Sequence, residues 1–259
     1  MNRRILFVLV AIVFFVACKK DPGSPDPGTG PGNPPPPGSV PPGQGINEPG
    51  YGPSTAAFRH PAWNPGNGVT VDGQLHNFEV CIGDTGWLKK HNRIGIPNSN
   101  MPMFLLCLNL KNNDPQGREI EIRLPPAIVI RSTRESTQNG IIITNSAVIR
   151  VPKQGKRIYC YTWCLNYQRR GPAGVTHPDE GYLYAWDMGP STIPDQLTEI
   201  VNILEPRQFT WDKVLKPDGI TEDYTKSSKL MIIQEAIWDV TDRNGLTEAR
   251  RKALRDITL

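Results

Sequence analysis

The cysteines are the residues of this sequence with the widest choice of chemistry. Cys18 ends an apolar N-terminal run, whereas Cys81, Cys107, Cys160 and Cys164 lie in apolar or alternating runs that predict β-strands. A thiol in such a strand can stay buried, pair in a disulfide or act as a nucleophile. On one continuous strand, Cys160 and Cys164 would lie about 13 Å apart, which is too far for a bond between them. Each would need Cys81 or Cys107 as a partner, and those two cysteines are also a possible disulfide of their own.

Gln234 is the second side chain that could take part in chemistry. On the helix predicted over residues 226–241, its neighbours at i−4, i+3 and i+4 are Leu230, Ile237 and Trp238. The carboxamide therefore borders the apolar face of that helix. A buried polar group that finds no partner costs about 1 to 3 kcal/mol, so we expect a group in the core to meet it.

Two short segments carry a resemblance to a known family. Gln234-Glu235-Ala236-Ile237-Trp238 resembles the Gln-x-Ala-Ile-Trp helix motif of the thioester domains of bacterial surface adhesins, and Trp163-Cys164-Leu165-Asn166 resembles the aromatic-Cys-Leu segment that begins their reactive half. In that family a cysteine thiol and a glutamine side chain condense, with loss of ammonia, into an internal thioester. The thioester then acylates an amine on a host surface.

The resemblance covers about residues 155–259 and implies roles for individual residues. Cys164 would supply the thiol and Gln234 the acyl group, while Ile237 and Trp238 would form the apolar wall that keeps water from the ester. Cys160 is an alternative source of the thiol. A purely structural interpretation stays open, in which Gln234 caps a backbone group in the core and both cysteines are buried thiols or halves of disulfides.

The N-terminus has the pattern of a secretory signal. Arg3 and Arg4 precede an apolar run over residues 5–17, which is shorter than the about 20 residues that a membrane-spanning helix needs. Residues 15–18, Phe-Val-Ala-Cys, resemble the lipobox of bacterial lipoproteins. The resemblance implies cleavage after residue 17, lipid on Cys18 as the membrane anchor, and an outer-membrane location that is exposed at the cell surface. Which leaflet carries the lipid stays open.

The residues that follow Cys18 predict a tether. Residues 18–55 are rich in proline and glycine and contain almost no apolar side chains, so they favour an extended, unpacked chain. The whole sequence has a formal net charge of +4, and its basic residues are interleaved with acidic ones. A partner made of nucleic acid is not indicated, because such a partner requires a basic patch or stripe.

The remaining residues predict a mainly β fold with C-terminal helices, namely an antiparallel β-sandwich over residues 56–166 packed against a loop and helical part over residues 167–259. Strand-like runs begin at Gln74, Met103, Glu119, Ala127, Gly140, Ala147 and Arg157. Helices are predicted over residues 196–204, with Thr192 and Asp195 as a capping box around Pro194, over residues 226–241, and after Thr247.

Other kinds of site have weaker support. The four histidines, His60, His76, His91 and His177, have no metal-ligand spacing, so we expect neither a metal nor a cofactor. Aromatic rings could instead stack on sugars or pack in the core, and the candidates are Trp163, Tyr182, Tyr184, Trp186 and Trp211. The sequence therefore predicts a lipid-anchored surface protein, not an enzyme, that serves attachment or ligand binding; if the thioester forms, the attachment to an amine-bearing protein or glycan is covalent. The alternative is a module that binds a glycan or a protein reversibly.

Overall fold

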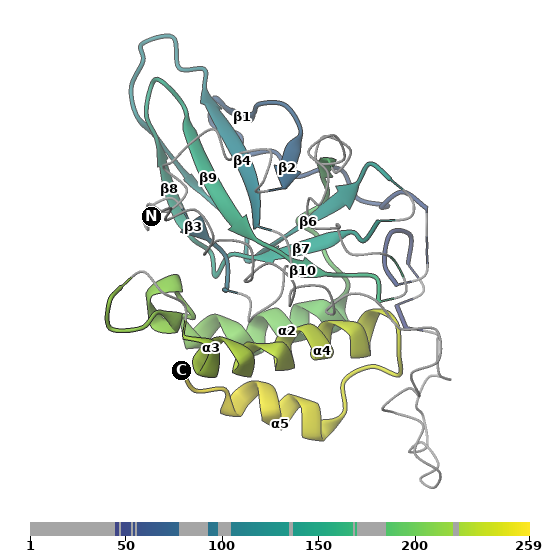
Figure 1. Ribbon diagram of the computed structural model, residues 1–259. Helices are drawn as coiled ribbons and strands as arrows, with labels where there is room; N and C mark the ends of the chain where they lie inside the picture. The colour runs from purple at the N-terminus through teal and green to yellow at the C-terminus, as the bar shows by residue number, and fades with distance from the viewer. Residues whose placement is uncertain are drawn as a thin grey trace, which may run out of the picture.

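The computed structural model describes residues 45–46, 48–52, 54, 56–77, 93–97, 105–134, 137–167, 169, 185–219 and 223–259. Outside them lie the predicted signal peptide and most of the predicted tether, together with Cys18, Cys81, His91, His177, Tyr182 and Tyr184. Within the described part, the chain is mainly β-structure followed by C-terminal helices, which confirms the predicted fold class (Figure 1).

The strands are short and most were predicted. They are β1 (Val69–Val71), β2 (Leu75–Asn77), β3 (Arg93–Ile94), β4 (Leu105–Asn112), β5 (Ile120–Arg123), β6 (Ala127–Ser132), β7 (Gly140–Ile143), β8 (Val148–Val151), β9 (Lys156–Tyr161), β10 (Trp163–Cys164) and β11 (Ala185–Met188). Every run that the sequence predicted as a strand contains one. The strands β1, β3 and β11 were not predicted, because none of them has an apolar run long enough to stand out.

Within the described residues, nine strands form one sheet and two form another. The large sheet has the order β10-β7-β6-β11-β2-β4-β9-β3, with β1 paired to β4, and β5 pairs with β8 separately. Every pair is antiparallel except β3 with β9. The two-sheet sandwich expected from the sequence is not confirmed, because nine of the described strands belong to one sheet. The division at residue 166 is wrong for the sheet, since β11 comes after it and lies between β6 and β2.

The large sheet curls until its ends meet. Strands β9 and β10 lie near opposite ends of the order, yet only Thr162 separates them in the chain. The backbone N–H of Ile96, just after β3, also donates to the carbonyl of Ile143 in β7 at 3.0 Å. Cys160 and Cys164 are therefore on two strands with different partners, and the case of one continuous strand considered from the sequence does not apply. A buried corner at Thr162, which is 0% exposed, turns the chain from one to the other.

Strands β6, β7 and β10 form the middle layer of the fold, between β4 and β9 on one side and the helices on the other (Figure 1). Their side chains alternate between two cores, because successive strand residues point to opposite faces. We call them the helix-side core, which receives Val129, Ile141 and Trp163, and the strand-side core, which receives Ile130 and Cys164. This double burial explains why β6 and β7 have continuous apolar runs instead of alternating ones.

Two helices, α2 (Asp195–Leu204) and α4 (Met231–Thr241), cover the middle layer, and α5 (Glu248–Asp256) packs on their outer side (Figure 1). The chain between α2 and α4 forms the short α3 (Tyr224–Ser227) and three 3₁₀ turns, η4 (Glu205–Arg207), η5 (Trp211–Val214) and η6 (Ser228–Leu230). The helix predicted over residues 226–241 is divided into the end of a short helix, a 3₁₀ turn and a helix that begins at Met231. The predicted apolar stripe of Leu230, Ile233, Ile237 and Val240 lies in the helix-side core. Thr247 caps α5 as predicted, and its hydroxyl accepts from the Arg250 N–H at 3.1 Å.

The start of α2 differs from the prediction. Pro194 is its N-cap and no side chain caps the helix, so the proposed box of Thr192 and Asp195 does not form. The N–H groups of Leu197 and Thr198 donate to the Pro194 carbonyl instead. Asp195 still lies in the first turn, where the positive end of the helix dipole favours a carboxylate. In the described residues, no helix has both the length and the apolar character to cross a membrane.

The packed part of the chain begins earlier than the predicted boundary at residue 56. We call Gly45, Ile46, residues 48–52 and Ser54 the strap. Ile46 and Tyr51 of the strap are 6% and 3% exposed in the helix-side core. The Ile46 N–H donates to the carbonyl of Val240 at 3.0 Å, so the strap lies against the C-terminal end of α4. The end of the predicted tether is thus wrong, because two apolar residues in a Pro/Gly-rich segment are enough to dock it.

Candidate functional site

The site is built on the outer edge of strand β10. In an antiparallel pair, alternate residues turn both backbone groups toward the partner strand or away from it. Leu165 turns toward the β7 side, since its N–H donates to the Asn139 carbonyl at 3.0 Å. Cys164, opposite Gly140, therefore turns its N–H and its carbonyl away from β7. Both groups are buried there, and among the described residues no strand pairs with this edge of β10. They therefore need another hydrogen-bond partner.

Gln234 is that partner. Its Oε1 accepts from the backbone N–H of Cys164 at 2.9 Å, and its Nε2 donates to the backbone carbonyl of Cys164 at 2.9 Å. The carboxamide thus takes the place that a peptide group of another strand would have. Both residues are 0% exposed. The core group that the sequence required for Gln234 is the main chain of Cys164.

Helix α4 positions the carboxamide because two of its faces are buried. Ile233 and Ile237 pack in the helix-side core and hold the helix against β7 and β10. Trp238, one turn beyond Gln234, reaches past the edge of β10 into the strand-side core, which also contains the side chains of Cys160 and Cys164. Gln234 therefore lies between the two cores, at the edge where α4 meets β10.

The two residues assigned to the apolar wall of a thioester separate in the structure. Trp238 lies in the same core as the Cys164 side chain. Ile237 precedes it by one residue, about 100° around the helix, and lies in the opposite core with Trp163. Of the two residues, only Trp238 therefore shares a core with the Cys164 side chain.

Two further side chains lie outward from Trp238. The ring of Tyr167 meets the Trp238 ring edge-on, with centroids 4.9 Å apart. The guanidinium of Arg243 lies over the outer side of the cluster, 4.9 Å from the Tyr167 centroid. Trp238 is 3% exposed and Tyr167 is half-buried. Cys164 and Trp238 are buried, whereas Tyr167 and Arg243 are both half-buried, so the two rings and the guanidinium lie between the Cys164 side chain and the surface.

The cysteines have different states. Cys160 and Cys164 are buried thiols that form no disulfide, whereas Cys107 is disulfide-bonded. Its partner is neither of those two, and the proposed pairing with Cys81 lies outside the described residues. Burial raises the pKa of the Cys160 thiol far above its ordinary value, which makes it a poor nucleophile. The contact of Gln234 with Cys164 favours Cys164 as the thiol that this site can use.

Sequence reasoning missed two asparagines beside the site. Asn166 is 0% exposed; its side chain accepts from the Asn139 N–H at 2.7 Å and donates to the Gly52 carbonyl of the strap at 2.6 Å. Asn139 donates to the Gly50 carbonyl at 2.8 Å. These amides connect the residues around Cys164 to the strap. The only signal was the place of Asn166 two residues after Cys164.

The end of α4 carries a buried carboxyl group. Asp242 is 5% exposed, and its Oδ2 accepts from the Thr241 hydroxyl at 2.6 Å. Its Oδ1 has no hydrogen-bond partner among the described residues. Burial raises the pKa of this carboxyl above its ordinary 3.8, although the bond from Thr241 opposes the shift. The folded protein therefore binds this proton more tightly than the unfolded chain.

Asp242→Asn is expected to stabilise the protein in a pH-dependent way. The carboxylate of Asp242 destabilises the fold when it is ionised, so the native protein loses stability as the pH rises from the ordinary aspartate pKa through the raised one. The Asp242→Asn variant has no carboxyl group to ionise at this position, so its stability does not fall in this way as the pH rises. Urea unfolding of both proteins between pH 4 and pH 8 should give a free-energy difference that grows with pH. A difference that is constant over this range would show that Asp242 titrates normally.

The aromatic residues proposed for sugar stacking have other uses. Trp163 and Trp186 are 0% exposed in the two cores. Trp211 is half-buried and its faces are occupied, since the Tyr161 ring stacks on it at 5.5 Å and the Arg93 guanidinium lies 3.9 Å from its centroid. Tyr182 and Tyr184 lie outside the described residues. The described part of the chain contains no group of three or more His, Cys, Asp or Glu side chains that could hold a metal ion.

No protein-family model, curated protein or solved structure matches the chain. An assignment of function therefore depends on the residues themselves and on the contacts described above.

Proposed function

We propose that this protein is a lipid-anchored surface protein that attaches covalently to an amine-bearing partner through a thioester between Cys164 and Gln234. The observation that carries the proposal is the pair of 2.9 Å hydrogen bonds between the Gln234 carboxamide and the main chain of Cys164. These bonds fix the acyl carbon beside the residue whose thiol would attack it. Positioning of this kind can lower a barrier by several kcal/mol.

The hydrogen bonds also favour the chemistry of the step. The thiol sulfur of Cys164 adds to Cδ of Gln234, the C–N bond breaks, and ammonia leaves with the proton of the thiol. Charge develops on Oε1 as the sulfur adds. The backbone N–H of Cys164 lies 2.9 Å from this oxygen, within the range of an oxyanion-hole donor. The bond from Nε2 to the Cys164 carbonyl orients the nitrogen that leaves.

When the thioester reacts with a partner, the Cys164 sulfur becomes the leaving group. The nitrogen of an amine attacks Cδ of Gln234, the C–S bond breaks, and the thiolate of Cys164 takes up a proton from the amine. The product is a stable amide between Gln234 and the partner, so each molecule reacts once and the protein is not an enzyme. Burial of the site under Trp238 and Tyr167 slows competing hydrolysis by water.

The anchor rests on the sequence. The charged n-region, the short apolar run and the small residue before Cys18 agree with one another as the parts of a lipoprotein signal. Several acyl chains on Cys18 would hold the protein on a bilayer, since each buried methylene contributes about 0.8 kcal/mol. The proline- and glycine-rich residues after Cys18 would then carry the folded part away from the membrane.

Peptide mass spectrometry of the full chain, purified from membranes and digested without reduction, tests the proposal. We expect Cys164 and Gln234 in one linked pair of peptides whose mass is lower by one ammonia. Methylamine should separate them, leaving a free Cys164 thiol and a methylated amide on Gln234. The N-terminal peptide of the same digest should begin at an acylated Cys18.

Single substitutions assign the atoms. Gln234→Ala and Cys164→Ala should both abolish the linked pair, whereas Cys160→Ala should retain it. If Cys160→Ala loses the link and Cys164→Ala retains it, the thiol belongs to Cys160 instead. If native protein shows no loss of ammonia, the thioester is refuted and both cysteines are structural. An N-terminal peptide that begins at Met1 would refute the anchor separately.

A further inference from the structure

An amine must reach the proposed thioester, and the structure covers both of its residues. Cys164 and Gln234 are 0% exposed, so a nitrogen atom can meet the acyl carbon only after a covering group has moved. Trp238, which shares a core with the Cys164 side chain, is also buried. The Tyr167 ring meets Trp238, the Arg243 guanidinium lies over Tyr167, and both outer residues are half-buried. The least buried part of this cover is therefore the pair of Tyr167 and Arg243.

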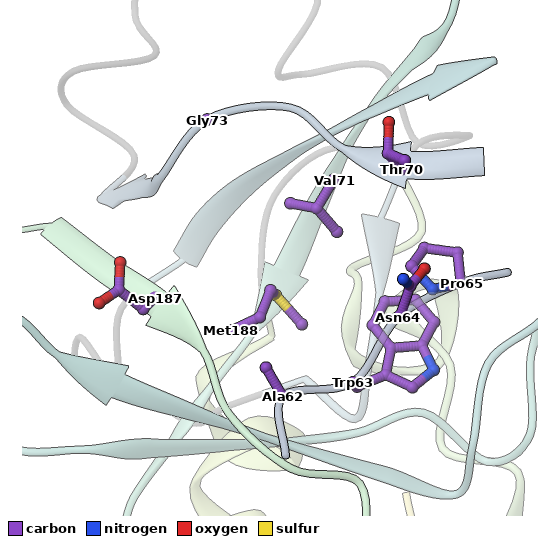
Figure 2. Close-up of a pocket in the computed structure, with 9 residues that line it drawn as sticks. All are labelled: Ala62, Trp63, Asn64, Pro65, Thr70, Val71, Gly73, Asp187 and Met188. Atoms are coloured by element: carbon purple, nitrogen blue, oxygen red, sulfur yellow. The ribbon is translucent and has the colours of Figure 1, made fainter. Parts of the chain in front are cut away.

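A hollow elsewhere on the surface does not lead to the acyl carbon. It lies beside Trp63, between the segment before β1, strand β1 and strand β11, and none of the candidate thioester residues lines it. The side chains of Val71 and Met188 lie in the middle of this hollow (Figure 2). The Asp187 carboxylate and the Thr70 hydroxyl point away from it (Figure 2). Among the described residues that line the hollow, no charged group faces an incoming amine.

Arg243 occupies a place that suits a cation. Its Cζ lies 4.9 Å from the centroid of the Tyr167 ring. Its Nη1 donates to Glu235 Oε2 at 2.9 Å and to Asp239 Oδ1 at 3.0 Å. An aromatic face attracts an ammonium or guanidinium ion, and carboxylate oxygens accept its N–H groups. We call the Tyr167 ring and the carboxylates of Glu235 and Asp239 the cation site.

Helix α4 places three carboxyl groups on the face that carries the cation site. Glu235, Asp239 and Asp242 follow one another at steps of four and three residues. Asp242 is buried, and its Oδ1 has no hydrogen-bond partner among the described residues. Burial raises the pKa of this carboxyl and the charge of Arg243 opposes the rise, so the carboxyl lies near the cation site. A buried acceptor without a donor is costly, and an ammonium group has three N–H donors to offer it.

The charges of the cation site leave room for a ligand when Arg243 moves. Nε of Arg250, in α5, donates to Asp239 Oδ2 at 2.7 Å and does not depend on Arg243. With Arg243 in place, the two arginines balance Glu235 and Asp239. Without it, the carboxylates outnumber the cations and the Tyr167 face is open. The Arg243 side chain is 28% exposed at the end of α4, so it can turn toward water without a change in the helix.

We propose that the ammonium group of a lysine side chain on the partner displaces the Arg243 guanidinium and takes its place on Tyr167 and Glu235. The inference rests on the proposed function, because it names the amine that the thioester receives. Glu235 directly follows Gln234 in α4, so the ammonium is held one residue along the chain from the acyl group. The four methylene groups of lysine let its nitrogen reach past Tyr167. An amino sugar carries its nitrogen directly on the ring and lacks this reach.

The ammonium must lose one proton before its nitrogen can attack. The Asp242 carboxylate, whose Oδ1 has no partner among the described residues, takes this proton and later returns it to water. The neutral nitrogen then forms a bond with Cδ of Gln234, and the C–S bond breaks. The Cys164 thiolate takes a second proton from the same nitrogen, which leaves a neutral amide and a thiol.

Binding to the cation site is measured in the full chain with Cys164→Ala, which cannot form a thioester. Saturation-transfer NMR follows Nα-acetyl-lysine methylamide, in a detergent without amine or acid groups, and the same compound acetylated on Nε is the neutral counterpart. We expect a Kd of the order of 10 mM for the charged probe and much weaker binding of the neutral one. A second substitution, Arg243→Ala, removes the internal competitor and should tighten binding about tenfold.

Matched variants assign the binding to these groups. Arg255→Ala removes an arginine and an exposed ion pair that involves no residue of the cation site, and should leave the affinity unchanged. Tyr167→Phe keeps the ring face, whereas Tyr167→Leu and Glu235→Gln should each weaken binding several-fold. Nα-acetyl-arginine methylamide should compete with the lysine probe without any substitution at Arg243. The inference is overturned if the neutral probe binds as tightly as the charged one, or if Arg243→Ala and Arg255→Ala bind the lysine probe equally.

Coupling to Gln234 gives a second readout in chains that retain Cys164. Arg243→Ala should increase the rate at which the lysine probe couples, as measured by peptide mass, and should change the rate with the uncharged nucleophile hydroxylamine less. Equal acceleration of both would mean that Arg243 is only a cover, which overturns the cation site. Methyl glucosaminide should couple several-fold more slowly than the lysine probe, and equal rates would overturn the choice of lysine. If no nucleophile couples to a chain that binds the probe as expected, the thioester is refuted and the cation site is retained.

Discussion

Gln234→Ala is expected to lower the free energy of unfolding by about 3 to 5 kcal/mol. The substitution removes the carboxamide that bonds the N–H and the carbonyl of Cys164, in a place that is 0% exposed. Each buried group left unsatisfied costs about 1 to 3 kcal/mol. The cavity left by the truncated side chain adds a further cost. Urea or guanidinium unfolding, followed at constant pH under non-reducing conditions, measures the change.

Cys164→Ala separates the hydrogen bonds from the proposed thioester. The bonds of Gln234 are made to the main chain of Cys164, so the alanine variant retains both of them and loses only the sulfur. Its cost should be about 1 kcal/mol if the thiol is free, and larger if a thioester had cross-linked β10 to α4. Glu235→Ala, at the next and more exposed position of α4, controls for helix propensity and in addition removes the partly exposed ion pair with Arg243, which contributes about 1 kcal/mol or less. A cost below about 1 kcal/mol for Gln234→Ala would contradict the role of the carboxamide as a substitute strand.

Gly52→Ala is expected to release the strap. Gly52 has a φ of +53°, and a Cβ atom there would lie 2.1 Å from the carbonyl oxygen of Thr241. Since backbone atoms lie on both sides of this contact, the strap must move away and lose the bond from Asn166. The variant should lose about 2 kcal/mol or more beyond the strain of a positive φ, and proteases should cut within the strap.

Gly219→Ala is the matched control for this experiment. Gly219 has a φ of +68°, close to that of Gly52, but no heavy atom of the described residues lies within 4 Å of the place that a Cβ atom would take there. It therefore reports the cost of the left-handed conformation alone, about 1 to 2 kcal/mol. Equal stability of the two variants, with the strap still resistant to proteases, would show that the clash with Thr241 is relieved without displacing the strap.

The sequence predicts local structure well where one physical rule decides it. The run that begins at Ala127 and the stripe of Leu230, Ile233 and Ile237 are apolar because they are buried. The run is strand β6 as predicted, and Ile233 and Ile237 are in α4 as predicted, although Leu230 lies in the 3₁₀ turn before it. Thr247 caps α5 because a hydroxyl there satisfies an N–H that has no partner within the helix. These features depend on neighbours that are close in the sequence.

Features that depend on distant neighbours were not predictable from the sequence. The four residues of β11 are a strand only because β6 and β2 lie on either side of them. The corner at Thr162 has no turn residue to mark it. For the candidate site, the sequence identified Cys164 and Gln234 by resemblance and the burial of Gln234 by its helical position. It could not indicate that Gln234 meets the main chain of Cys164, because that contact depends on the register of β10 with β7.

The docking of the strap also determines how the fold would bear mechanical load. In a chain held at Cys18 and attached to a partner, tension from the membrane reaches the described part of the molecule at Gly45. The Ile46 N–H is bonded there to the Val240 carbonyl, which lies less than two turns along α4 from Gln234. Force would therefore act on the helix that carries the acyl group before it acts on any strand of the sheet, and pulling on the tether and opening of the covalent site would be mechanically coupled.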